Sequence, residues 1–150
     1  MENINKKEFV LGFAFNNTAD KCLLIEKNRP VLLKGTFNGI GGKVEKGEDC
    51  FQAMKREFQE ETSIHTEEID WHHFNTLNLY EDNGFHLIIY CFKSFTDKVF
   101  KAKTVTDENV KLFNINDLNS IKLTPYVNFL IPMALEGELQ SSSMELYVNF

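Results

Sequence analysis

The segment GGKVEKGEDCFQAMKREFQEETSI, residues 41–64, joins a glycine-containing turn to a strongly charged helical pattern. Its glycines suit a tight loop or a close approach of the backbone. Asp49 is a residue type that caps helix N-termini, so we expect a helix from about Cys50 to about Thr62. The segment therefore predicts a loop followed directly by a helix, and the rest of the chain is interpreted around it.

The predicted helix carries three glutamates on one face. Glu57, Glu60 and Glu61 stand at i, i+3 and i+4, which places them within an arc of about 100°. Like charges at this spacing repel by a few tenths of a kcal/mol per pair, so the helix gains nothing unless a cation lies among them. Oxygen-only ligands suit Mg²⁺, with Mn²⁺ as a substitute. The alternative is a solvated acidic face, which is common for charge runs.

The spacing of the surrounding residues carries a family resemblance. It follows the pattern G-x5-E-x7-R-E-U-x-E-E-x-G-U, in which U is a bulky aliphatic residue, through Gly42, Glu48, Arg56, Glu57, Phe58, Glu60, Glu61 and Ile64. The chain therefore resembles the Nudix hydrolases, with residues 42–64 as the Nudix box.

Two positions depart from this pattern. Phe58 occupies an aliphatic position, and Ser63 stands where the box has its second glycine. A glycine there would end the helix in the left-handed conformation, which costs a serine about 1 kcal/mol. We therefore interpret Ser63 as a variation of the turn and not as loss of the site.

The remaining chain predicts a single α/β domain over residues 1–150. Apolar and β-branched runs separated by turn residues indicate two hairpins, one from segments 8–15 and 21–27 and one from segments 70–80 and 84–93. An extended segment is expected over 31–37, a hairpin-like region over 95–105 and a strand over 110–114. One helical turn is expected over 117–120, and a second helix over 125–135, with Pro125 at its first position, a kink at Pro132 and Gly137 as its stop. Residues 140–143 are expected to be a flexible connection to the C-terminal segment. This arrangement fits an α/β/α sandwich with a mixed sheet, the fold that the Nudix resemblance also implies.

Composition and charge restrict the class of partner. The chain is 43% hydrophobic and 25% charged, which is typical of a soluble globular domain, and its formal charge of −6 argues against binding to a nucleic-acid polymer or an anionic membrane. Three widely spaced cysteines favour buried thiols in a reducing compartment. The first residues show no apolar leader, and the chain has no apolar run of 18 residues. We therefore expect a cytoplasmic monomer or homodimer that acts on a small nucleotide.

The resemblance assigns roles to the charged positions. It implies that Glu57, Glu60 and Glu61 ligate the metal together with the backbone carbonyl of Gly41, and that Glu57 is a common candidate for the general base. Arg56 is implied to pair with Glu48 and to orient the catalytic glutamates, and its alternative is a surface salt bridge.

An acid outside the box often completes the metal set in this family. Asp107 and Glu108, directly before the strand predicted over 110–114, are the plausible suppliers. The alternative is a polar turn.

Substrate recognition is predicted from the segment FNGIGGKV, residues 37–44. It is similar to the approach segment of MutT-like enzymes that remove oxidised purine nucleoside triphosphates, in which an Asn at the place of Asn38 contacts the base. Phe37, Lys43 and Tyr126 are further substrate-binding candidates, and the alternative for the two aromatic residues is the core. The adjacent aspartates of the animal oxidised-purine enzymes are absent, because Tyr126 and Val127 stand there.

The predicted reaction is Mg²⁺-dependent hydrolysis of a nucleoside triphosphate to a monophosphate and pyrophosphate. A first alternative is hydrolysis of a dinucleoside polyphosphate, ADP-ribose or a nucleoside diphosphate sugar. Tyr80 follows the box at about the distance of the tyrosine that the resemblance associates with dinucleoside polyphosphate substrates. A second alternative is a non-catalytic module that binds a nucleotide as a sensor. Such modules commonly have eroded boxes, whereas all the carboxylates remain here.

Overall fold

A mixed β-sheet forms the centre of the protein. The structure is a computed structural model that describes residues 5–82, 84–137 and 142–148. Its strands are β1 (Asn5–Phe15), β2 (Lys21–Glu26), β3 (Phe37–Asn38), β4 (Ile40–Lys43), β5 (His72–Glu81), β6 (Phe85–Phe95), β7 (Val110–Asn114) and β8 (Ser142–Val148). The main order is β3-β2-β1-β6-β5-β8, while β4 pairs with β1 and β7 pairs with β2. Strand β6 pairs with β1 in parallel and with β5 in antiparallel orientation, so the sheet is mixed.

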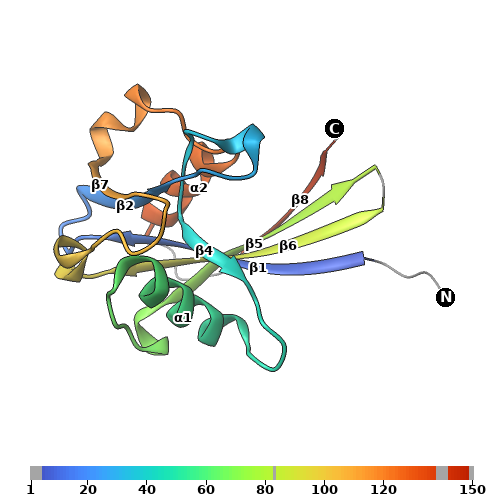
Figure 1. Cartoon of the computed structure of the whole chain (residues 1–150), viewed down its shortest axis with the longest axis horizontal. Coiled ribbons are helices and arrows are strands. Elements are labelled where there is room, and N and C mark those ends of the chain that lie inside the picture. Colours follow the sequence, from blue (N-terminus) through green and yellow to red (C-terminus); the bar gives the residue numbers. More distant parts are fainter. Residues whose placement is uncertain (1–4, 83, 138–141, 149–150) are drawn as a thin grey trace.

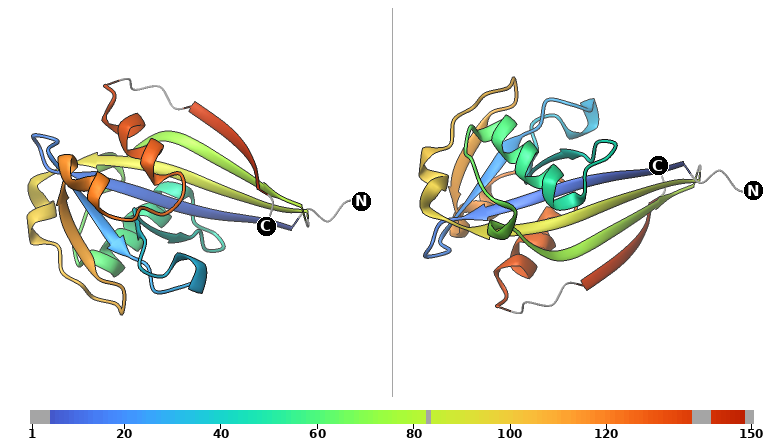
Figure 2. Two further views of the ribbon diagram at one scale, coloured as in Figure 1. Left: turned by 90° about the horizontal axis from the view of Figure 1, so that it is seen from above. Right: turned by 90° about the horizontal axis from the view of Figure 1, so that it is seen from below.

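The two α-helices cover opposite faces of this sheet. Helix α1 (Cys50–Thr62) lies below the sheet and α2 (Val127–Leu135) above it in Figure 1, and the views in Figure 2 show the same separation. The shorter 3-10 helices are η1 (Val31–Leu33), η2 (Glu68–Asp70), η3 (Asp97–Lys101) and η4 (Ile115–Ser120). Within the described ranges, no helix has both the length and the apolar character needed to cross a membrane.

Alternation along β1 divides the apolar residues between two cores. Val10 and Ala14 belong to a buried cluster with Met54 and Phe58 of α1, which we call the α1-side core. Leu11 belongs to the cluster that includes the buried residues of α2, the α2-side core. Successive side chains of a strand point to opposite faces, so this one strand fixes which helix lies on which face.

Local signals account for the bounds of α1. The Asp49 side chain accepts a hydrogen bond from Gln52 N at 2.9 Å, and the Gln52 side chain accepts one from Asp49 N at 2.9 Å, which completes a capping box. At the other end Ser63 is left-handed, with φ 66°, and its N–H donates to the Gln59 carbonyl at 2.9 Å. The helix predicted from Cys50 to Thr62 is confirmed, including the left-handed turn at Ser63.

The other sequence predictions have mixed outcomes. Both predicted hairpins, the strand over 110–114 and the helical turn over 117–120 are confirmed. The prediction of an extended segment over 31–37 is wrong for most of its length, because i to i+3 hydrogen bonds from Leu33 N to Pro30 O and from Thr36 N to Leu33 O form a helical turn.

Three further boundaries are corrected. The region 95–105 contains η3 and no hairpin, since Thr96 caps that helix and Val99 is buried in the α1-side core. Helix α2 begins at Val127, because Tyr126 is left-handed with φ 67°, so Pro125 is not its first residue. Residues 140 and 141 lie outside the described residues, but Ser142 and Ser143 begin β8 and are not a loop.

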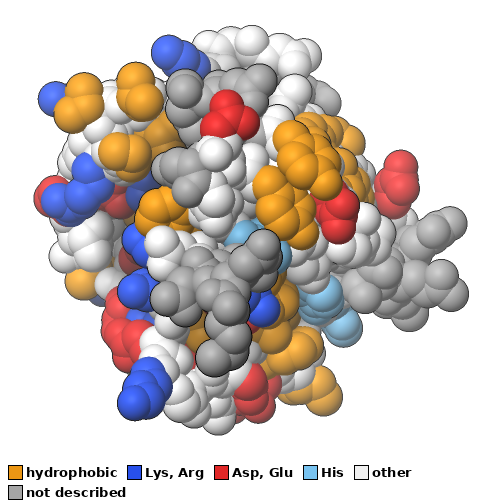
Figure 3. All heavy atoms as spheres, turned by 90° about the vertical axis from the view of Figure 1, so that its right-hand side faces the viewer, with side chains coloured by type: hydrophobic (Ala, Val, Ile, Leu, Met, Phe, Trp, Pro, Cys, Tyr) orange, Lys and Arg blue, Asp and Glu red, His pale blue; other side chains and the backbone are white. Residues whose placement is uncertain are grey.

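The long strands extend past both helices. Their ends lie to the right in Figure 1, and Figure 3 faces them and shows apolar, acidic and histidine side chains side by side. There Tyr80 stacks on His86 with ring centroids 4.4 Å apart and on Tyr147 with centroids 5.2 Å apart. This end of the sheet therefore carries a continuous aromatic stack.

Candidate active site

Arg56 is the centre of a hydrogen-bond network on α1. Its Nε and Nη2 donate to the two carboxylate oxygens of Glu48 at 3.1 and 2.6 Å. Its Nη1 donates to Glu57 Oε1 at 2.8 Å and Glu60 Oε2 at 3.2 Å, and its Nη2 also reaches the Lys43 carbonyl at 3.0 Å. The guanidinium lowers the pKa of Glu48 chiefly through these hydrogen bonds. A forked, charge-assisted pair of this kind holds both side chains in one orientation.

Glu57 lies against the backbone of β4. A Cβ atom on Gly42 would stand 2.5 Å from Glu57 Cδ and Oε1, so the absence of a side chain at this position makes room for the carboxylate. Burial raises the pKa of Glu57, and the neighbouring charge of Arg56 opposes that rise. The glycine of the loop and the glutamate of the helix thus form one structural unit.

Glu61 is the most unusual charged residue of the helix. Its Oε2 is buried and has no hydrogen-bond partner among the described residues. Burial raises the pKa of Glu61 to about 8, with further contributions from the charges of Glu57, Glu108 and Glu60. Lys27 is the nearby charge that opposes the rise. Lys27 is already paired with Glu108, so it compensates the buried Glu61 carboxylate only in part.

Glu108 faces the same place from the loop before β7. It is only 7% exposed, its Oε1 accepts from Lys27 Nζ at 3.0 Å and its Oε2 accepts from Asn28 N at 2.6 Å. The structure thus brings Glu108 into the electrostatic environment of Glu61, although 47 residues separate them in the sequence. The neighbouring Asp107 is exposed and pairs instead with Arg29 at 2.6 Å.

Sequence reasoning missed Lys27 and the N–H of Asn28. Lys27 follows directly after β2, and nothing in its local pattern distinguishes it from the other lysines. The pairing of β2 with β7 sets Ile25 opposite Val110. This pairing brings Lys27 and Asn28, which follow β2, beside Glu108, which precedes β7.

The predicted substrate-binding residues are divided between the two faces of the sheet. Asn38 pairs with Ile25, a residue of the α1-side core, and directly opposite residues of an antiparallel pair share a face. Phe37 and Tyr126 instead pack against the α2-side core. Lys43 is exposed at the end of β4 and uses its carbonyl to hold Arg56. The structure therefore places Asn38 on the side of the carboxylates. Lys43 pairs with Phe9, which packs against the α2-side core, so only its carbonyl reaches Arg56. Phe37 and Tyr126 are not brought to the carboxylates either.

The residues present fit a divalent cation. The donors are hard carboxylate oxygens, and one of them, Glu61 Oε2, is buried without a partner. In the described part of the chain no three acidic, histidine or cysteine side chains converge on one point as they stand. The Arg56 guanidinium bridges Glu57 and Glu60, donating from Nη1 to one carboxylate oxygen of each. The fit to a cation rests on the donor chemistry and on the unpartnered oxygen of Glu61.

Comparison with known proteins agrees with this geometry. A family model described as NUDIX domain matches residues 7–133. A MutT protein from Bacillus halodurans has a similar structure, with a TM-score of 0.76 and 16% identity, covering 95% of this chain and 90% of that one. A MutT NUDIX hydrolase from Burkholderia pseudomallei gives a TM-score of 0.71 at 20% identity, over 87% of this chain and 98% of that one. None of the curated proteins matches the sequence.

The chain belongs to the Nudix hydrolase family, whose members act on phosphoanhydride bonds. The structural neighbours share its fold. Because their sequences are only 16% and 20% identical to this chain, the likeness is evidence for the fold alone. Nudix hydrolases generally use divalent metal ions and small nucleotide substrates. The resemblance inferred from residues 42–64 is thereby confirmed, as is the α/β sandwich fold.

Proposed function

We propose that this Nudix hydrolase converts a nucleoside triphosphate to a nucleoside monophosphate and pyrophosphate, with Mg²⁺ as its cofactor and Mn²⁺ as a substitute. The observation that carries the proposal is the unpartnered, buried oxygen of Glu61 beside Glu57 and Glu108. Burying acids together is costly unless a cation compensates them, and oxygen donors favour these two ions.

Each residue has a distinct task in this proposal. Glu57, Glu60, Glu61 and Glu108 would hold the metal together with the Gly41 carbonyl. When bound, the metal neutralises phosphate charge and lowers the pKa of water. Glu57 is our candidate for the group that accepts a proton from the attacking water, because burial raises its pKa. Arg56 positions Glu57 through its own hydrogen bonds, and Glu48 holds Arg56 in place.

Asn38 is the favoured residue for recognition of the base. It lies on the α1 side of the sheet, and its Oδ1 already accepts from Gly39 N at 2.8 Å, which orients the side-chain amide. An amide can pair with the edge of a purine. The pairing of Lys43 with Phe9 argues against a phosphate contact by its ammonium group, and the core packing of Phe37 and Tyr126 favours a structural role for both.

The alternative of a dinucleoside polyphosphate substrate receives less support. Tyr80, the residue that suggested it, stacks between His86 and Tyr147 at the far end of the long strands. A ring engaged on both sides has no free face on which to stack a second base.

A substrate panel tests the proposal. Hydrolysis is measured with and without Mg²⁺ by separating the nucleotide products, phosphate and pyrophosphate by anion-exchange chromatography, for canonical and oxidised nucleoside triphosphates, dinucleoside polyphosphates and ADP-ribose. We expect one triphosphate to be preferred and to give pyrophosphate, and Glu61→Gln to reduce kcat by roughly a hundredfold or more with the fold intact. Glu145→Gln, which removes an exposed acid on β8, is the matched control.

Two results would contradict the proposal. Full activity in Glu61→Gln would remove the assignment of the metal site. Absence of turnover across the panel, in protein shown to be folded by circular dichroism, would favour the non-catalytic nucleotide-binding module.

A further inference from the structure

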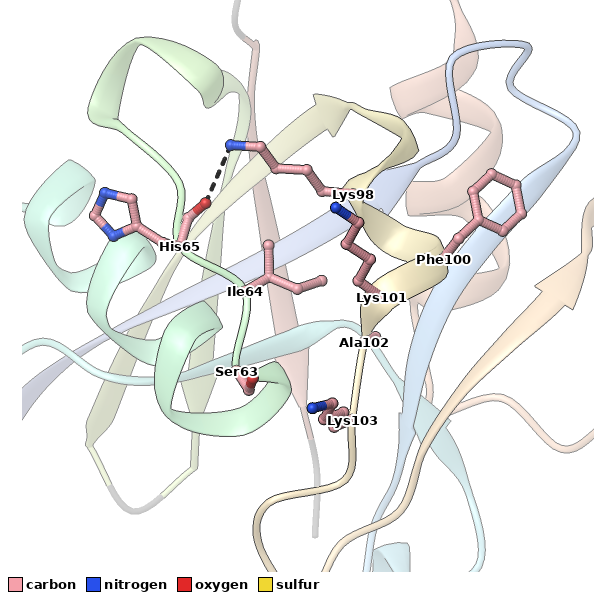
Figure 4. Close-up of a pocket in the computed structure, with 8 residues that line it drawn as sticks. All are labelled: Ser63, Ile64, His65, Lys98, Phe100, Lys101, Ala102 and Lys103. Carbon is pink, nitrogen blue, oxygen red and sulfur yellow. Dashed lines mark hydrogen bonds between the residues drawn. The ribbon is translucent and has the colours of Figure 1, made fainter.

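A second depression lies at the C-terminal end of α1. It has a volume of about 750 Å³ and is lined by Ser63, Ile64, His65, Lys98, Phe100, Lys101, Ala102 and Lys103. Figure 4 shows these residues, which come from the turn after α1 and from η3 with the residues that follow it. The metal-site glutamates Glu57, Glu60 and Glu61 are not among the lining residues. The depression is therefore distinct from the candidate active site.

The lining concentrates positive charge in an acidic protein. Three lysines fall within six residues of the chain, although the formal net charge is −6. Lys98 Nζ donates to the His65 carbonyl at 3.2 Å, the contact drawn in Figure 4. Over the described ranges, Lys101 and Lys103 take part in none of the ion pairs of the structure. Two ammonium groups thus border the depression without a counter-charge.

Capping of α1 does not account for these lysines. Basic side chains near a helix C-terminus often bind its last carbonyl groups. Here the Phe58 carbonyl accepts from Thr62 Oγ1 at 2.6 Å, and the Gln59 carbonyl accepts from Ser63 N at 2.9 Å. The Thr62 carbonyl accepts the backbone N–H of Lys103 at 3.0 Å, so the side chain of that lysine is not needed. The ammonium groups remain for a ligand from solution.

Two acids that lie close to the lining residues in the sequence, Asp97 and Glu67, also have other partners. Asp97 Oδ1 accepts from Asn17 N at 2.8 Å. Glu67 pairs with His65 at 2.8 Å and with Lys55 at 3.4 Å. The carboxylates of Asp97 and Glu67 therefore have partners other than Lys101 and Lys103.

We propose that this depression binds a phosphate or pyrophosphate group, either free or carried by a nucleotide. The lysines supply charge-assisted hydrogen bonds to the anion. Phe100 is 55% exposed, and its ring points away from the lysines in Figure 4, so it is a candidate contact for the base of a nucleotide only at the outer edge of the depression. The bond from Lys103 N to the Thr62 carbonyl connects the depression to the residue directly after Glu61. The inference rests on this geometry and is independent of the proposed triphosphatase activity.

Amide NMR titration of the whole chain tests the proposal. Pyrophosphate and AMP are added separately, with EDTA present so that no divalent metal binds. We expect the amide signals of residues 63–65 and 98–103 to shift, and those of residues 27 and 108 to stay unchanged. Lys101→Glu should weaken pyrophosphate binding by about tenfold, and added salt should weaken binding to the wild-type chain.

Two variants serve as controls. Lys101→Arg keeps the charge and should retain the affinity. Lys6→Glu makes the same charge reversal on an exposed residue at the start of β1. The depression lies near the other end of this strand, because the Phe15 carbonyl accepts from Thr96 N just before η3. This variant should bind pyrophosphate as the wild-type chain does.

The outcomes separate the sources of the anion. Tighter binding of AMP, lost in Phe100→Ala, identifies a nucleotide as the ligand. If AMP and pyrophosphate bind with equal affinity, and Phe100→Ala changes neither affinity, the ligand is a free phosphate group. Unshifted signals at residues 63–65 and 98–103 at millimolar ligand, or equal binding by Lys101→Glu, would overturn the proposal. Because turnover and metal play no part, such a failure leaves the proposed hydrolase function untouched.

Discussion

Adjacent glycines 41 and 42 of β4 serve different purposes. A Cβ atom on Gly41 would lie 1.9 Å from the Val10 carbonyl oxygen, which belongs to the backbone of the neighbouring strand. The three atoms nearest to a Cβ atom on Gly42 would all belong to the Glu57 carboxylate, the end of a flexible side chain. The first glycine thus permits the strand pairing, and the second makes room for a charged group of the candidate site.

Alanine at each glycine should therefore affect different properties. Gly41→Ala is expected to lower the free energy of unfolding by several kcal/mol, because backbone must move. Gly42→Ala should change it by less than about 1 kcal/mol but lower kcat by roughly tenfold or more, because Glu57 is displaced. Urea unfolding and steady-state kinetics of both variants measure these effects. A large loss of stability in Gly42→Ala with normal kcat would contradict the interpretation.

The sequence alone predicted the positions of some site residues and not of others. The charges of the box have fixed spacing on one helix, so Glu57, Glu60 and Glu61 share a face by helical geometry alone. Lys27 joins them only through long-range strand pairing, which leaves no local pattern. The same limit explains Phe37, since an aromatic residue beside a site looks identical in sequence to an aromatic residue of the core.

Elements with local signals were predicted best. The capping box at Asp49 and the turn at Ser63 lie within the sequence of α1, so both bounds of the helix were predicted correctly. The region 95–105 was predicted wrongly, because burial of Val99 under α1 and stacking of Phe95 on Phe15 at 5.2 Å decide its path. Such tertiary contacts override the β propensity of the segment.

The left-handed turn of α1 allows a stability prediction. Ser63→Gly should raise the free energy of unfolding by up to about 1 kcal/mol, because glycine adopts φ 66° without strain. Ser63→Ala keeps the strain and serves as the control for loss of the hydroxyl group. Chemical denaturation measures both variants. A Gly variant less stable than the Ala variant would show that the turn is not strained.

At the scale of the whole molecule, a buried lysine joins the sheet to α2. Lys93 of β6 is 5% exposed, and its Nζ donates to the Ala134 carbonyl at 2.9 Å and the Glu136 carbonyl at 3.1 Å. These carbonyls belong to the C-terminal end of α2, where intrahelical donors are lacking. The lysine therefore helps to fix the second helix on its face of the sheet.

Removal of this connection should loosen α2. Lys93→Met keeps the length of the side chain but leaves two carbonyl groups without their donor, so we expect a loss of about 1–3 kcal/mol. Hydrogen exchange should rise in α2 more than in α1. Lys122→Met, at an exposed lysine, is the control and should change stability little. Equal stability of Lys93→Met and the wild-type chain would show that the connection is dispensable.

The central claim is that the buried Glu61 carboxylate needs a bound cation beside it. Its pKa in the folded chain is raised from 4.5 to about 8, so the folded chain holds this proton more tightly than the unfolded chain. Stability from this source is fully present below the unfolded pKa and is lost as the pH rises through about 8. A bound divalent cation would restore it.

The most direct test is the thermal unfolding temperature of wild-type and Glu61→Gln chains at about pH 9, with and without Mg²⁺. We predict that the metal-free Glu61→Gln chain unfolds a few degrees higher than the metal-free wild type, because no charge is buried. We also predict that Mg²⁺ raises the unfolding temperature of the wild type and leaves that of Glu61→Gln nearly unchanged. Equal stabilisation of both chains by Mg²⁺ would contradict the assignment of the metal site to Glu61 and its neighbours.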